Sequence, residues 1–144
     1  MDVMPQSDGH TLVLPKTPAE NLFDLDPEMA AAVICNGQRI AAAVKRAFNA
    51  DGITLMQFNG PVAGQTVFHL HVHIVPVKQG VPLKPHAGQM ADPAALAATA
   101  NRCRNDEVIQ LQSGIRLPAN RQGHALLSTS SRHRSIAFKA LNIK

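Results

Sequence analysis

The sequence has few aromatic residues and few cysteines: its 144 residues include no Trp, no Tyr, five Phe and two Cys. Proteins that bind single-stranded nucleic acid combine a basic groove with aromatic platforms, so this composition argues against such a partner. Cys35 and Cys103 lack the paired spacing of a zinc site and fit free thiols in a reducing compartment. No apolar run approaches the ~20 residues of a membrane span, and no secretory signal is recognisable. We therefore expect a cytoplasmic protein that binds neither nucleic acid nor membrane.

Acidic residues are missing from the last quarter of the chain. Residues 1–107 hold eight Lys and Arg against ten Asp and Glu, whereas residues 108–144 hold six Lys and Arg and no acid. The second region is also rich in Ser and Arg and shows no sustained hydrophobic period. A chain of this length has room for one domain with a real core. The sequence thus predicts a folded domain over 1–107 and a basic C-terminal extension of unknown role over 108–144.

The hydrophobic pattern of the first region predicts three strands around one long helix. Residues 27–48 follow an N-cap, Asp26, and carry apolar residues at spacings of three and four, which is typical of one face of an amphipathic helix. Cys35 falls within this helix and is expected in the core. Runs of β-formers bounded by Gly, Pro or Asn predict strands, and Gly- and Pro-rich stretches predict loops. The expected elements are strands near 10–15, 53–59 and 66–77, a loop over 78–93 and an Ala-rich helix from Asp92 to about Arg104.

The last predicted strand carries three of the seven histidines. It reads TVFHLHVHIVPV over 66–77, with His69, His71 and His73 at every second position. Because successive side chains of a strand point to opposite faces, the three imidazoles are expected on one face. Phe68, Leu70 and their alternate neighbours form the other face, which is apolar enough to pack on the long helix. A face with three histidines is too polar for a core and therefore predicts a cleft.

Two chemistries fit alternating histidines. His-x-His pairs on strands bind zinc and other transition metals through neutral imidazole nitrogens. A closed metal site would need further ligands; no carboxylate or cysteine lies near the strand, although His10 could supply one from elsewhere. In phosphate chemistry, by contrast, an imidazole attacks an activated phosphorus while its neighbours move protons and meet the phosphoryl charge.

The segment before the histidines favours the phosphate chemistry. Residues 59–66 read NGPVAGQT, a loop of small residues that leads directly into the strand. Glycines let backbone amides approach a bound anion closely. Gln65 and Thr66 add side-chain donors at the same edge.

The run His-Leu-His-Val-His-Ile-Val over 69–75 resembles the histidine triad superfamily, whose hallmark is His-φ-His-φ-His-φ-φ with φ apolar. The resemblance extends through GPVAGQTVFHLHVHIVP and includes DGHTLVLPK at 8–16. It implies an α+β fold, an antiparallel sheet with one long packed helix, and a homodimer. It also implies a nucleotide phosphohydrolase or nucleotidyl transferase, without cofactor or metal, acting on nucleoside phosphoramidates, dinucleoside polyphosphates or related esters. AMP or another purine nucleotide is the expected ligand.

The resemblance also assigns roles to single residues. His71 is the expected nucleophile, which forms a nucleotidyl-histidine intermediate; His69 orients the centre, His73 contacts phosphate and assists the leaving group, and His10 relays to the triad. The expected substrate-binding residues are Asp2 at the ribose, Val3 beside the base, and Asn59, Gly64, Gln65 and Thr66 around the phosphate.

Other interpretations of single residues stay open. His10 could be a buried histidine without a catalytic role, and Asp2 a frayed terminal residue. His86, His124 and His133 lie in loop or tail sequence and are expected to be simply exposed. The whole protein could also bind nucleotides without catalysis, or more remotely bind metal.

The sequence departs from the family in three places, of which one is the extension over 108–144, which resembles nothing in the family. Phe58 stands where many members carry Asn or Gln, so one polar contact is lost. The domain also begins almost at Asp2, and is therefore expected to lack the strands that usually come first.

Overall fold

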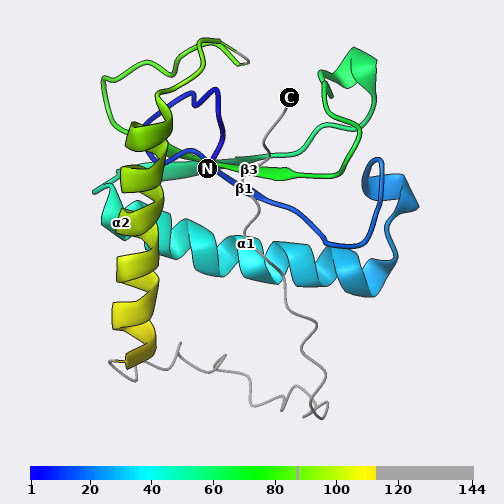
Figure 1. Cartoon of the computed structure of the whole chain (residues 1–144). Helices are drawn as coiled ribbons and strands as arrows, with labels where there is room; N and C mark the ends of the chain where they lie inside the picture. Colours follow the sequence, from blue (N-terminus) through cyan, green and yellow to red (C-terminus); the bar gives the residue numbers. More distant parts are fainter. Residues whose placement is uncertain (87, 113–144) are drawn as a thin grey trace.

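The computed structural model describes residues 1–86 and 88–112. Two long helices and a small sheet make up this part, joined by loops and two short 3-10 turns (Figure 1). In chain order the elements are β1 (Thr11–Val13), η1 (Leu22–Asp24), α1 (Pro27–Ala47), β2 (Gly52–Met56), η2 (Pro61–Ala63), β3 (Val72–Val77) and α2 (Pro93–Gln112). The expected α+β class is confirmed. The domain boundary near residue 107 stays a prediction, since most of the extension lies outside the described residues.

The long helix forms where the sequence predicts it. The Asp26 carboxylate accepts a hydrogen bond from the N–H of Met29 at 2.9 Å, and Pro27 occupies the first turn, where its missing N–H costs nothing. The buried stripe includes Val33, Gly37 and Val44. The expectation for Cys35 is wrong: its side chain is exposed, because it follows Ile34 on the outer face of the helix.

The sheet has the strand order β1-β3-β2, and both pairs are antiparallel. β3 is therefore central, and α1 runs beneath the sheet (Figure 1). Leu70, Val72 and Ile74 point into the layer between them and join the hydrophobic core with Val33 and Val44 of α1.

The predicted strand over 66–77 is wrong in its first half, because β3 begins only at Val72. The pairing with β1 ends at Val72 and the pairing with β2 ends at His73. Upstream of this point the backbone bonds to a loop instead, with the N–H of Leu70 donating to the carbonyl of Ala19 at 2.8 Å. Phe68 consequently does not pack on the helix and is 55% exposed.

The second helix is longer than expected and reaches Gln112. It crosses α1 near the end of that helix (Figure 1). There Arg46 donates to the Asp106 carboxylate through two nitrogens, and the Arg102 guanidinium lies 4.4 Å from the centre of the Phe48 ring. No helix in residues 1–86 and 88–112 is long and apolar enough to cross a bilayer.

Candidate active site

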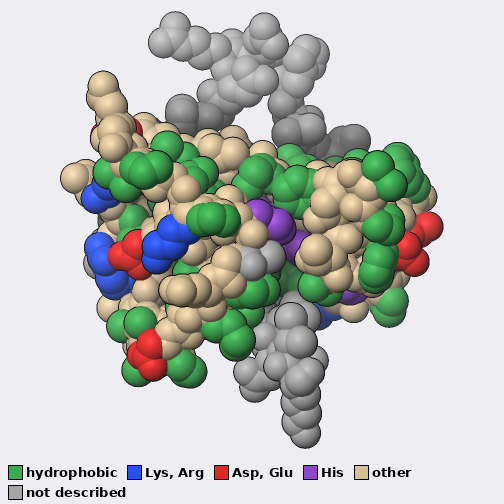
Figure 2. Space-filling view, turned by 90° about the horizontal axis from the view of Figure 1, so that it is seen from above, with side chains coloured by type: hydrophobic (Ala, Val, Ile, Leu, Met, Phe, Trp, Pro, Cys, Tyr) green, Lys and Arg blue, Asp and Glu red, His purple; other side chains and the backbone are tan. Residues whose placement is uncertain are grey.

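The sheet face opposite α1 carries a hollow that holds the histidines. Figure 2 shows histidine side chains near the middle of this face of the molecule, with apolar side chains beside them. Three segments meet here: the N-terminal segment, the stretch that leads into β3, and the loop after β3. The pocket is lined by Met1, Asp2, Val3, Met4, Leu12, Thr66, Val67, His71, His73 and His86.

His71 lies where the chain enters β3 and is half-buried. Its Nδ1 is 2.7 Å from the backbone carbonyl of His69. A carbonyl oxygen can only accept, so Nδ1 of His71 carries the proton and donates. The other ring nitrogen, Nε2, therefore holds a free electron pair, which is the form in which an imidazole acts as a nucleophile.

The expectation that all three imidazoles line one cleft is wrong for His69, which does not line this pocket because it precedes β3. Its Nε2 donates to the carbonyl of Pro15 at 3.0 Å. This bond ties the stretch before β3 to the loop after β1, and the carbonyl of His69 in turn holds the ring of His71. The structure thus places His69 where it can orient His71 through the backbone.

His73 and His10 are both buried, at 2% and 0% exposure, and form one hydrogen-bonded pair. Nε2 of His10 is 2.9 Å from Nδ1 of His73, and Nδ1 of His10 accepts from the backbone N–H of Gln6 at 3.1 Å. Because Nδ1 of His10 accepts, the proton of that ring sits on Nε2 and is donated to His73. His73 must then carry its own proton on Nε2.

The Nε2–H of His73 has no hydrogen-bond partner among the described residues, although it is buried. His73 lines the pocket, and its ring centre lies 4.8 Å from that of His71. The two rings thus offer a substrate opposite groups: a lone pair from His71 and a donor from His73.

Both members of this pair stay neutral near pH 7. Burial lowers the pKa of His10 to about 4, against the opposing effect of the Asp2 carboxylate. Burial, with smaller effects of the neighbouring imidazoles of His71, His10 and His86, lowers the pKa of His73 to about 3. Desolvation disfavours the charged imidazolium, so the neutral tautomers of His10 and His73 derived above are the forms present near pH 7.

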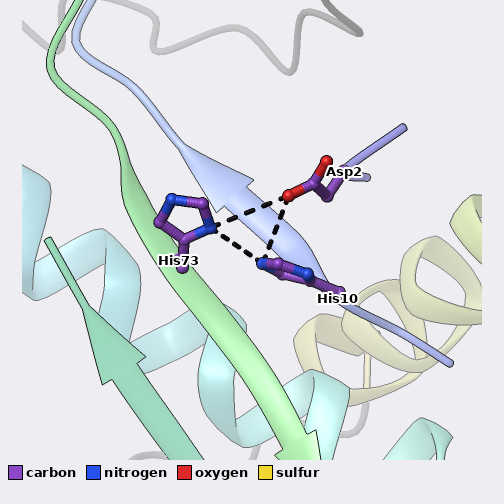
Figure 3. A group of neighbouring side chains, drawn as sticks. All are labelled: Asp2, His10 and His73. Atoms are coloured by element: carbon purple, nitrogen blue, oxygen red, sulfur yellow. Dashed lines mark hydrogen bonds and ion pairs between the residues drawn. The ribbon is translucent and has the colours of Figure 1, made fainter. Parts of the chain in front are cut away.

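Asp2 closes the group on the side of the N-terminal segment (Figure 3). Its Oδ2 lies 3.5 Å from Nε2 of His10 and 3.7 Å from Nδ1 of His73. Its Oδ1 accepts from the N–H of Met4 at 2.9 Å, and its own N–H donates to the carbonyl of His10. Asp2 is therefore an ordered, buried residue beside His10, and the alternative of a frayed terminus is wrong.

The spacing of Asp2, His10 and His73 suits a metal, but the ring protons do not. The three facing atoms lie within 4.8 Å of one another, and a tetrahedral zinc bound at ~2.1 Å would space its ligands about 3.4 Å apart. A metal needs both facing nitrogens unprotonated. Nε2 of His10 carries a proton as long as the N–H of Gln6 occupies Nδ1. The hydrogen bonds thus favour a proton-ordered relay over a metal centre.

The loop over 59–66 places only some of its predicted residues in the pocket. Thr66 is exposed and lines it. Gln65 is buried and uses its side chain to hold the loop, accepting from the N–H of Gly60 and donating to the carbonyls of Glu20 and Val67. The sequence identified Gln65 as a phosphate donor, but in the structure its side chain is fully occupied.

Asn59 and Gly64 also shape the loop. The side-chain oxygen of Asn59 accepts from the N–H of Leu22, and its amide nitrogen donates to Gln57. Gly64 adopts a φ of 96°, which side chains rarely tolerate, and ends η2. Neither residue lines the pocket.

Two further rings lie beside His73: Phe58, which was expected near the site, and His86, which was not. Phe58 packs against Gly64 and meets the ring of His73 edge-on, with the centres 5.6 Å apart. His86, expected to be simply exposed, reaches the pocket from the loop after β3. No local pattern marks His86, although nine residues after Val77 give ample reach to return, at ~3.3 Å each.

Comparison with known proteins is consistent with this geometry. The family model "HIT domain" matches residues 1–80. An uncharacterized HIT-like protein of Mycobacterium tuberculosis is 41% identical over 90 residues, which are 62% of each chain. A bis(5'-adenosyl)-triphosphatase of Dictyostelium discoideum is 40% identical over 55% of this chain and 53% of its own. The chain thus spans less than two thirds of the length of these relatives.

A solved structure shows the same fold. A HIT-like protein from Bartonella henselae, described as involved in cell-cycle regulation, superposes with a TM-score of 0.70 at 48% identity, covering 74% of this chain and 76% of the other.

Proposed function

Because this chain belongs to the HIT, or histidine triad, domain family, we propose that it is a nucleotide phosphohydrolase or nucleotidyl transferase acting at the α-phosphorus of its substrate. The substrate class is nucleoside phosphoramidates, dinucleoside polyphosphates or related esters. The family includes a relative named as a bis(5'-adenosyl)-triphosphatase.

The observation that supports this function is the pairing of opposite tautomers in one pocket. Nε2 of His71 holds a lone pair because Nδ1 donates to the carbonyl of His69, and Nε2 of His73 holds a proton because Nδ1 accepts from His10. A nucleophilic displacement at phosphorus needs an attacking lone pair and a donor for the oxygens that gain charge.

The reaction would proceed in two steps. Nε2 of His71 forms a bond to the α-phosphorus while the bond from phosphorus to the leaving group breaks, and the leaving group departs with that electron pair. The N–H of His73 donates to the oxygens that become more negative. Water or another acceptor then forms a bond to the phosphorus of the nucleotidyl-histidine and loses its proton to solvent. The bond from phosphorus to Nε2 breaks, and its electron pair returns to His71.

The nucleoside is proposed to lie along the N-terminal segment. The Asp2 carboxylate, which lines the pocket beside His73, would accept from the ribose hydroxyls, and Val3 would contact the base. Thr66 would donate to the phosphate. Asn59, Gly64 and Gln65 would act through the shape of the loop, because their hydrogen-bonding groups are used within the protein.

The deciding experiment is mass spectrometry of the intact protein after mixing with an activated AMP ester. We expect a mass gain of one adenylyl group, located on His71 by peptide mapping. His71→Ala should gain nothing, and His124→Ala should label like the wild type. Tight AMP binding without the adduct would select the alternative, a nucleotide-binding protein without catalysis.

The assembly and location of the protein also remain proposals. We propose a homodimer through the outer face of α1 and the edge strand β2, where Ile34 and Leu55 are exposed. The expected cytoplasmic location stays a prediction.

A further inference from the structure

The loop after β3 brings a third imidazole into the pocket, beside those of His71 and His73. The ring of His86 lies 5.3 Å from the ring of His73, centre to centre, and meets it nearly edge-on at 72°. It also lies 5.5 Å from the ring of Phe58. Unlike His73, which is 2% exposed, His86 is exposed.

Two sets of contacts hold the loop in this place. The N–H of Lys84 donates to the carbonyl of Gln6 at 2.9 Å, and the side-chain amide of Gln6 donates back to the carbonyl of Lys84 at 3.2 Å. Further along, the N–H of Ala91 donates to the carbonyl of Val3 at 2.9 Å. The segment that carries Asp2 and the loop that carries His86 are thus joined on both sides of His86.

The relay through His10 is a poor source of protons for the leaving group. His73 can donate a hydrogen bond, but if it gave its proton away, its protein partner, Nε2 of His10, would have to supply the replacement. His10 would then become an imidazolate, since the N–H of Gln6 is an amide and supplies no proton. Among the described residues that line the pocket there is also no Lys or Arg to meet a departing negative charge.

His86 is the lining residue that meets this need. It lies against His73, and an imidazole N–H can donate a hydrogen bond to an oxygen of a departing phosphate. Phe58, which replaces the Asn or Gln of many family members, gives the ring of His86 a surface to pack on.

We propose that His86 is a specificity-determining residue that contacts the leaving group and favours leaving groups that carry a phosphate. This inference rests on the proposed function, because the leaving group is defined by attack of His71. Its N–H donates to the phosphate next to the scissile bond. Hydrogen bonds of this kind to a charged oxygen are among the stronger ones in proteins.

The test measures binding, so that it does not depend on turnover. The affinity of the full chain for AMP is compared with that for α,β-methylene-ADP, whose carbon bridge resists cleavage and whose second phosphate occupies the leaving-group position. We expect the wild type to bind the diphosphate about tenfold more tightly than AMP. His86→Phe keeps a ring on Phe58 but has no N–H, and it should lose this preference while its AMP affinity stays within about twofold.

Two further variants separate hydrogen bonding from packing. His86→Gln retains a donor and should keep part of the preference, and Val81→Ala, an exposed residue of the same loop, should keep all of it. Equal affinity of the wild type for both ligands would overturn the proposal, and so would a preference that survives in His86→Phe. Neither result depends on adduct formation at His71, so failure of the proposed function is recorded separately.

Discussion

The backbone N–H of Gln6 points at Nδ1 of His10, 3.1 Å away, and this bond sets the direction of the hydrogen bonds beyond it. An amide N–H only donates, so His10 must donate from its other nitrogen, and His73 must accept at Nδ1. A main-chain group outside the histidine motif thus decides which atom of His73 faces the substrate with a proton.

Nuclear magnetic resonance of the imidazole nitrogens tests this order directly. In the neutral protein we expect protonated Nε2 at His10 and His73, and protonated Nδ1 at His71. Gln6→Pro removes the donor and should populate the second tautomer of His10, whereas Gln6→Ala keeps the N–H and should leave the spectrum unchanged. A protonated Nδ1 at His73 in the wild type would contradict the relay.

Loss of the donor at His73 should slow the chemical step. His73→Phe fills the buried site but has no N–H, and we expect kcat on an adenosine phosphoramidate to fall about a hundredfold or more. His71→Ala should fall further, because it loses the nucleophile. A His73→Phe variant with wild-type kcat would remove His73 from the mechanism.

Stability should decrease as the pH is lowered below about 6.5. Burial lowers the pKa of His10 to about 4 and that of His73 to about 3, whereas an unfolded histidine titrates near 6.5. Between these values the unfolded chain binds more protons than the folded one, so the free energy of unfolding is fully retained above pH 6.5 and falls towards pH 4. Each pKa unit corresponds to about 1.4 kcal/mol, so the loss should reach a few kcal/mol. Urea unfolding across this range measures the slope, which should be shallower in His10→Gln; an equal slope would show that these residues are not responsible.

Gly9 should tolerate no side chain. Its φ is 90°, and a Cβ at this position would lie 2.6 Å from Cδ2 of the buried Phe48 ring. The ring has little room to move, because Arg102 packs on it. Gly9→Ala should therefore destabilise the protein by about 2–4 kcal/mol in denaturant unfolding. Gly52→Ala, where a Cβ would contact nothing within 4 Å, is the matched control.

The exposed apolar surface of α1 and β2 predicts association. Ile34 and Leu55 are 57% and 47% exposed, and β2 lies at one edge of the described sheet. An unpaired edge with apolar side chains favours pairing with another chain. Sedimentation should show a dimer in the wild type and a monomer in Leu55→Lys, with Lys45→Ala as a surface control. A monomeric wild type at micromolar concentration would refute the dimer.

The sequence predicted the elements whose formation depends on local periodicity, and α1 is the clearest case. The cap at Asp26 and the apolar stripe with Val33 and Val44 define α1 in any context, and the structure confirms the helix. Strand length depends on partners, and β3 begins late because β1 and β2 supply no partner before Val72.

The site was predictable only as far as the motif reaches. His71 and His73 face one pocket as expected. His86 could not be found, since its position depends on a long loop bonded to the N-terminal segment. The side chain of Gln65 has the same chemistry whether it faces phosphate or a carbonyl, so its actual partner depends on the folded loop.

Hydrogen bonds between Gln6 and Lys84 and between Val3 and Ala91 join two segments that lie far apart in the sequence. Because these bonds use main-chain groups of the loop, a loop grafted from a relative to change which substrates are accepted must keep an N–H at positions 84 and 91, in register with Gln6 and Val3. A graft with Pro at either position would remove one of the bonds that hold the segment carrying Asp2.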